Sequence, residues 1–81
     1  MGILLVDDEP VDIVVMQRSL ESVGYDTLVA ASYDEALAQL TAHGLEIEML
    51  ITDVSLPGRT GLDIARACLR RLPQLKVFSV F

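Results

Sequence analysis

Residues 2–9 read Gly-Ile-Leu-Leu-Val-Asp-Asp-Glu, a short apolar run that stops at acidic residues, and Pro10 follows directly. An apolar run of this length is typical of a strand that is buried on both faces and carries polar groups at its carboxyl end. Pro10 fits the first turn of a helix, where its missing N–H costs no hydrogen bond. The stretch therefore predicts a buried strand over 2–6 that leads straight into a helix.

The rest of the chain repeats this alternation of strand and helix. Helix boundaries are marked by Gly24, by the capping-box spacing of Ser32 and Glu35, and by Pro73. The predicted elements are strands over 2–6, 26–31, 48–52 and 76–81 and helices over 10–23, 32–43 and 61–72. The order β-α-β-α-β-α-β specifies a parallel sheet with right-handed crossovers and helices on its faces. We therefore predict an α/β three-layer sandwich, with residues 1–81 as one domain or part of one.

Composition limits the function as well as the fold. Twelve Asp and Glu residues stand against six Lys and Arg, which gives a net charge of −6. This balance argues against nucleic acid binding by this segment, because Arg66, Arg70 and Arg71 form only a small basic patch. No apolar run approaches the roughly 20 residues of a membrane span, no signal peptide is recognisable, and the single Cys68 excludes an internal disulfide. We expect a soluble cytoplasmic protein without a membrane partner.

Acidic residues follow two of the predicted strands. Asp7 and Asp8 come after the first strand, and Asp53 comes after the third. If these strands are neighbours, three carboxylates converge at the edge where open parallel sheets bind ligands. Crowded carboxylates repel one another unless a cation lies among them, and an all-oxygen set favours Mg²⁺. Asp8 or Glu9, taken singly, could instead only cap the next helix, whereas Asp53 precedes a Leu-Pro-Gly loop.

Two motifs carry a family resemblance that covers nearly the whole chain. The segments Ile3-Leu-Leu-Val-Asp-Asp-Glu-Pro10 and Ile51-Thr-Asp-Val-Ser-Leu-Pro-Gly-Arg-Thr-Gly-Leu62 resemble the receiver domain of bacterial two-component response regulators. The resemblance implies the flavodoxin-like receiver fold, a parallel five-stranded sheet in the order 2-1-3-4-5 with helices on both faces. This chain would lack the last helix-strand-helix of that fold, as if truncated after the fourth strand.

The resemblance also implies roles for the acidic residues. Asp53 would be the phosphoacceptor, taking a phosphoryl group from a histidine kinase or phosphotransfer protein. Mg²⁺ would be held by Asp7, Asp8 and Asp53 together with the backbone carbonyl of Ser55. No enzymatic activity is expected, because an aspartyl phosphatase would need a general acid two residues after its nucleophile, and Ser55 is not one.

The end of the chain leaves two questions open. The family has a Ser or Thr at the end of the fourth strand that hydrogen-bonds the phosphoryl group, and this switch position falls at Ser79 or at Phe81, which has no hydroxyl. The apolar fourth strand also lacks a covering helix, so either a longer domain or a partner such as a second copy would cover it. The alternative function is therefore a phosphorylation-independent interaction or dimerisation module that self-associates through the exposed edge of this strand.

Overall fold

The computed structural model describes residues 2–53 and 60–80. Its elements, in chain order, are β1 (Gly2–Val6), α1 (Pro10–Ser22), β2 (Asp26–Ala30), α2 (Tyr33–His43), the short 3₁₀ helix η1 (Gly44–Glu46), β3 (Ile47–Asp53), α3 (Gly61–Arg71) and β4 (Lys76–Val80). The predicted β-α-β-α-β-α-β order is confirmed. Among the described residues, no helix is long and apolar enough to cross a membrane.

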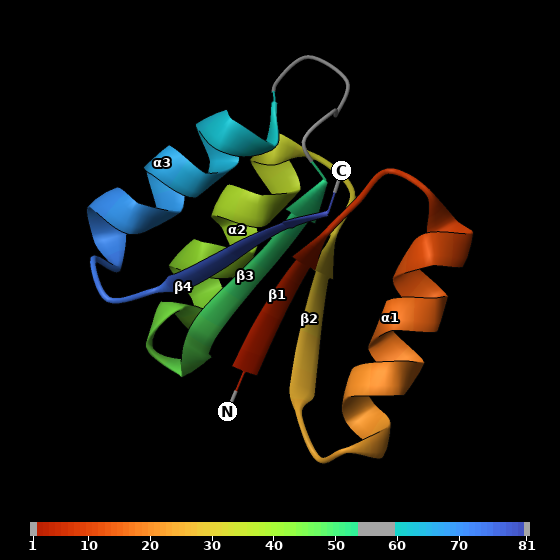
Figure 1. Cartoon of the computed structure of the whole chain (residues 1–81). Helices are drawn as coiled ribbons and strands as arrows, with labels where there is room; N and C mark the ends of the chain where they lie inside the picture. The colour runs from red at the N-terminus through yellow and green to blue at the C-terminus, as the bar shows by residue number, and fades with distance from the viewer. Residues whose placement is uncertain (1, 54–59, 81) are drawn as a thin grey trace.

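The four strands form one parallel sheet in the order β2-β1-β3-β4. Helix α1 packs on one face of the sheet, and α2 and α3 lie side by side on the other (Figure 1). This is the three-layer sandwich that the sequence predicts. Strand β1 lies between β2 and β3, so the carboxyl ends of the first and third strands are neighbours at one edge.

The core lies between the sheet and the layer formed by α2 and α3. Leu4, Leu50 and Val77 stand in register across β1, β3 and β4, and they pack with Ile64 and Cys68 of α3 in one apolar cluster. Leu4, Leu50, Ile64 and Cys68 are completely buried. Each large aliphatic side chain buried in this way stabilises the fold by about 1.5–3 kcal/mol.

The ends of the predicted elements shift by one residue at several places. Strand β3 runs from Ile47 to Asp53 instead of 48–52, because Ile47 pairs with Gly2 and Asp53 pairs with Val80. The sequence did not predict η1, the 3₁₀ helix that connects α2 to β3. Strand β2 ends one residue earlier than expected, and α1 and α3 are each one residue shorter at their carboxyl ends.

The structure confirms some of the predicted helix-capping residues and changes others. Gly24 has a positive φ of 97°, as its place after α1 predicts. Ser32 accepts a hydrogen bond from the backbone N–H of Glu35 at 3.2 Å, but the Glu35 carboxylate accepts from the Ser32 hydroxyl and not from its N–H. A complete capping box is present instead at Thr60 and Asp63, where α3 begins. The spacing of Thr60 and Asp63 was a signal that the sequence reading missed.

Candidate metal centre

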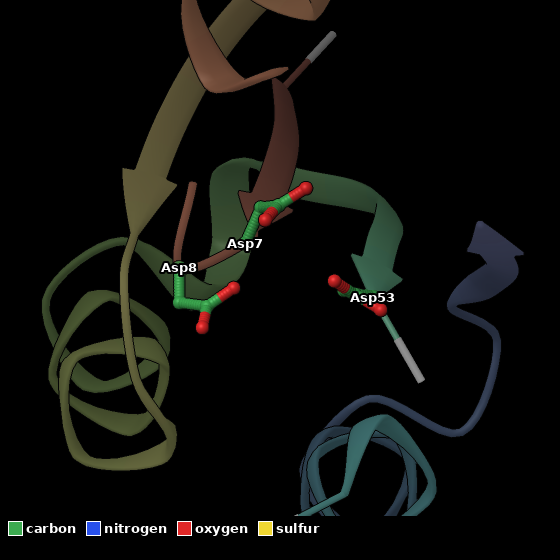
Figure 2. Close-up of side chains that lie close together, drawn as sticks. All are labelled: Asp7, Asp8 and Asp53. Atoms are coloured by element: carbon green, nitrogen blue, oxygen red, sulfur yellow. The ribbon is translucent and has the colours of Figure 1, made fainter. Parts of the chain in front are cut away.

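Three carboxylates converge at the carboxyl edge of the sheet. Asp7 and Asp8 follow the last residue of β1, and Asp53 is the last residue of β3. Val6 pairs with Thr52 in the register, so the residues that follow them emerge side by side. One carboxylate oxygen from each of the three aspartates lies within 4.8 Å of the others. Figure 2 shows these side chains gathered around one space, and the predicted convergence is confirmed.

The three carboxylates differ in their exposure to solvent. Asp7 is only 5% exposed, Asp53 is half-buried and Asp8 is exposed. Burial raises the pKa of the Asp7 carboxyl above its ordinary value, and the negative charges of Asp53, Asp12 and Asp8 raise it further. A hydrogen bond from the backbone N–H of Glu9 to Asp7 Oδ1, 2.9 Å long, opposes this rise. A positive charge inside the cluster would therefore relieve the electrostatic strain on Asp7.

The donor set fits a hard divalent cation. All three groups offer oxygen, and none offers the nitrogen or sulfur that Zn²⁺ and the softer transition metals prefer. Oxygens on opposite sides of a Mg²⁺ ion lie about 4.2 Å apart, so a cluster within 4.8 Å matches the size of one coordination sphere. Asp7, Asp8 and Asp53 thus suit Mg²⁺, with room for further oxygen ligands.

The helix-capping alternative finds no support at Glu9. This residue occupies the N-cap position of α1, but its side chain makes no capping hydrogen bond. The carboxylate that accepts a backbone N–H near this helix start is that of Asp7, which holds the turn between β1 and α1. Sequence reasoning missed this contact, although an Asp side chain commonly accepts a hydrogen bond from the backbone N–H two residues further on in such a turn.

Other predicted site residues are placed only in part. Ser55 and Phe81 lie outside the described residues, so the expected carbonyl ligand and the second switch position stay predictions. Ser79 is an exposed residue of β4 that pairs with Thr52, one register position before Asp53. Asp53 itself pairs with Val80. Ser79 therefore stands below the level of the acidic cluster and is not brought into it.

A group of exposed valines lies on α1, the helix that begins just after the acidic cluster. Val11, Val14 and Val15, which we call the valine patch, are between 43% and 66% exposed. Their spacing of three and four residues puts them on one side of the helix. The sequence reading did not single them out, because α1 is apolar on more than one side.

The comparison with protein families agrees with the resemblance seen in the sequence. The model of the response regulator receiver domain matches residues 3–80, nearly the whole chain. The chain belongs to the response regulator receiver family. The sheet order β2-β1-β3-β4 agrees with the first four positions of the 2-1-3-4-5 order that the resemblance implies for such a receiver.

Individual relatives of this receiver domain are moderately similar. The transcriptional regulatory protein AruR of Pseudomonas aeruginosa is 37% identical over 67 residues, which is 79% of this chain and 28% of AruR. A response regulator receiver domain protein from Clostridium thermocellum has a crystal structure that superposes with a TM-score of 0.91 at 32% identity, covering 96% of this chain and 62% of that one. The chain thus spans about a quarter of AruR and less than two thirds of the Clostridium chain.

A third relative, the response regulator TrrA of Thermotoga maritima, is known in two informative complexes. Its structure with Mg²⁺ and BeF superposes with a TM-score of 0.87 at 27% identity and covers 99% of this chain and 70% of TrrA. Its structure with the histidine kinase ThkA superposes with a TM-score of 0.85 at 28% identity and covers 96% of this chain and 66% of that one.

Proposed function

We propose that this receiver domain accepts a phosphoryl group on Asp53 from a histidine kinase or phosphotransfer protein in a two-component phosphorelay. The observation that carries the proposal is the convergence of Asp7, Asp8 and Asp53 at the carboxyl edge of the sheet. The TrrA complexes with Mg²⁺ and BeF and with a histidine kinase support the same chemistry in a relative.

In the proposed reaction Asp53 is the nucleophile. One of its carboxylate oxygens attacks the phosphorus of a phosphohistidine, a new P–O bond forms, and the P–N bond breaks with its electron pair left on the imidazole nitrogen. Phosphoryl transfer demands mainly positioning and charge neutralisation from the protein. The end of β3 supplies the position, because the backbone of Asp53 is fixed by its pairing with Val80.

Asp7 and Asp8 would hold Mg²⁺ together with Asp53 and the carbonyl of Ser55. The bound ion would offset the negative charge shared by the aspartates and the incoming phosphoryl group. Asp7 would act as a fixed ligand, since it is buried and held by the Glu9 N–H. The exposed Asp8 would leave the site open to solvent and to a donor.

The valine patch offers a docking surface for the donor protein. The patch lies on α1, and this helix begins at Pro10, two residues after Asp8 of the acidic cluster. A partner that buries Val11, Val14 and Val15 would gain hydrophobic stabilisation while its phosphohistidine approaches Asp53. The kinase complex of TrrA supports a kinase as this partner.

Intact-mass measurement after incubation with acetyl phosphate and Mg²⁺ tests the proposal. We expect a gain of one phosphoryl group in the wild type, no gain in Asp53→Asn, and a gain in the matched variant Asp34→Asn, which replaces an exposed carboxylate of α2. A folded wild type that gains nothing, or an Asp53→Asn variant that gains as much, would contradict the phosphoacceptor role.

A phosphorylation-independent interaction module is the second candidate. Phe78 of β4 is 54% exposed, and β4 is an outer strand of the sheet formed by the described residues. An exposed aromatic side chain on an outer strand favours association with another chain. Sedimentation of the unphosphorylated wild type and of Phe78→Ser tests this candidate. The interaction-module proposal requires that the unphosphorylated wild type self-associates and that Phe78→Ser does not.

A further inference from the structure

Helix α3 carries half of the basic residues of an otherwise acidic chain. The protein has six Lys and Arg residues and a net charge of −6, and three of the six are Arg66, Arg70 and Arg71. Arg71 is engaged, since its guanidinium donates a hydrogen bond to Thr41 Oγ1 of α2 at 2.7 Å. Arg66 and Arg70 are exposed and make no ion pair or hydrogen bond with another described side chain. Two cations are therefore available for a partner.

These two arginines line a shallow groove on the outer side of the helical layer. The groove has a volume of about 650 Å³, and its lining residues are Tyr33, Asp63, Arg66, Leu69 and Arg70. Tyr33 begins α2 and the other four belong to α3, and the two helices lie side by side in Figure 1. Leu69 is 37% exposed and stands between the arginines in sequence. The groove thus brings an exposed leucine and the ring-bearing Tyr33 together with two arginines and one aspartate.

The chemistry of the groove selects among partners. A guanidinium pairs with a carboxylate through two parallel hydrogen bonds, which suits an acidic side chain. A polyanion such as a nucleic acid would meet the carboxylate of Asp63 in the same groove and the net negative charge of the chain. A peptide lessens the local repulsion from Asp63, because it can place acidic side chains at the arginines and an apolar one elsewhere.

We propose that this groove binds a short acidic segment of a partner protein. Acidic side chains of the segment pair with Arg66 and Arg70, and one apolar side chain packs on Leu69 and the ring of Tyr33. The site shares no residue with the acidic cluster and needs neither Mg²⁺ nor phosphorylation. It gives the receiver domain a second contact surface of opposite charge to its acidic edge.

Fluorescence anisotropy with a labelled synthetic peptide, Glu-Glu-Leu-Glu-Asp-Leu-Glu-Glu, tests this proposal on the whole chain. We expect saturable binding that the double variant Arg66→Glu, Arg70→Glu weakens at least tenfold. The matched variant Arg18→Glu removes an exposed arginine on α1 and should change the affinity less than twofold. Replacing both leucines of the peptide by serine should weaken binding about fivefold or more. Circular dichroism checks that the variants, which alter only exposed side chains, remain folded.

Several results would overturn the proposal. Absence of saturable binding would do so, as would an equal loss of affinity in Arg18→Glu and in the double variant. Equal binding of the leucine-free peptide, or tighter binding of a single-stranded oligonucleotide, would show a general anion site. Self-association that disappears in the double variant would identify a second copy as the occupant. Each outcome is independent of whether Asp53 accepts phosphate.

Discussion

The two faces of the sheet are covered in different ways. Helix α3 buries five of its residues against the sheet and α2, among them Ile64 and Cys68. Helix α1, which among the described helices covers the other face by itself, has no fully buried residue, although it is longer and carries as many apolar side chains. The helices α2 and α3 therefore contribute fully buried side chains to the core, whereas α1 keeps apolar side chains available for contact with partners.

The largest expected effect comes from breaking the α2–α3 face. Leu50→Ala removes a completely buried side chain at the centre of the core cluster. We expect a loss of about 2–5 kcal/mol in the free energy of unfolding, because the cavity adds to the lost transfer energy. Phe78→Ala on the other face should cost less than about 1 kcal/mol, since this ring is already half exposed. Urea unfolding of both variants measures the contrast, and equal losses would contradict it.

A smaller change in the free energy of unfolding, this time a gain in stability, is expected at the acidic edge. Asp7→Asn removes a buried charge that repels its neighbours, while its side-chain oxygen can still accept the Glu9 N–H. Without Mg²⁺ we expect a gain on the order of 1 kcal/mol at neutral pH, which raises Tm by about 4–8 °C in a domain of this size.

The pH dependence gives the sign of the Asp7 contribution. Its pKa is raised in the folded state, so the folded chain retains this proton to higher pH than the unfolded chain does. The loss of stability caused by the charged Asp7 carboxylate is absent below its ordinary pKa near 3.9. It grows as the pH rises through the raised pKa of the folded state. The stability difference between Asp7→Asn and wild type should therefore widen with rising pH. Thermal melts across this window that showed a constant difference would contradict the assignment.

The smallest effect on stability, but a large one on partner recognition, is expected at the valine patch. Val15→Asp should change the free energy of unfolding by less than about 0.5 kcal/mol, because this side chain is exposed. Phosphorylation by acetyl phosphate should be unchanged, whereas transfer from a phosphorylated histidine kinase should slow at least tenfold. Rapid-quench assays compare the rates of phosphorylation by acetyl phosphate and by the phosphorylated kinase. Equal slowing with both donors would show damage to the acidic site instead of a docking role.

Much of the fold could be predicted because its signals are local. The buried run over 2–6 followed by Pro10, and the positive φ at Gly24, are set by burial and backbone sterics and can be read from the sequence. The 3₁₀ helix η1 could not, since short 3₁₀ turns depend on how the flanking elements meet. Strand β3 begins at Ile47 because this residue pairs with Gly2, a contact that only the sheet provides.

The candidate site divides in the same way. Convergence of Asp7, Asp8 and Asp53 followed from strand adjacency and could be predicted. The burial of Asp7 beside an exposed Asp8 could not, because it depends on how the turn into α1 folds over the sheet. The valine patch escaped notice for a related reason, since Val11 and Val15 share α1 with apolar residues on its other sides. Tertiary packing alone decides which of these sides is exposed.

The shared cation site of Asp7, Asp8 and Asp53 is the basis of the proposed function, and calorimetric titration with Mg²⁺ tests it most directly. We expect one saturable Mg²⁺ site per chain, with the affinity lowered at least about tenfold by Asp7→Asn or Asp53→Asn and unchanged by the matched variant Asp34→Asn. Absence of saturable binding by the folded wild type, or equal binding by all four proteins, would show that the three carboxylates do not form a metal site.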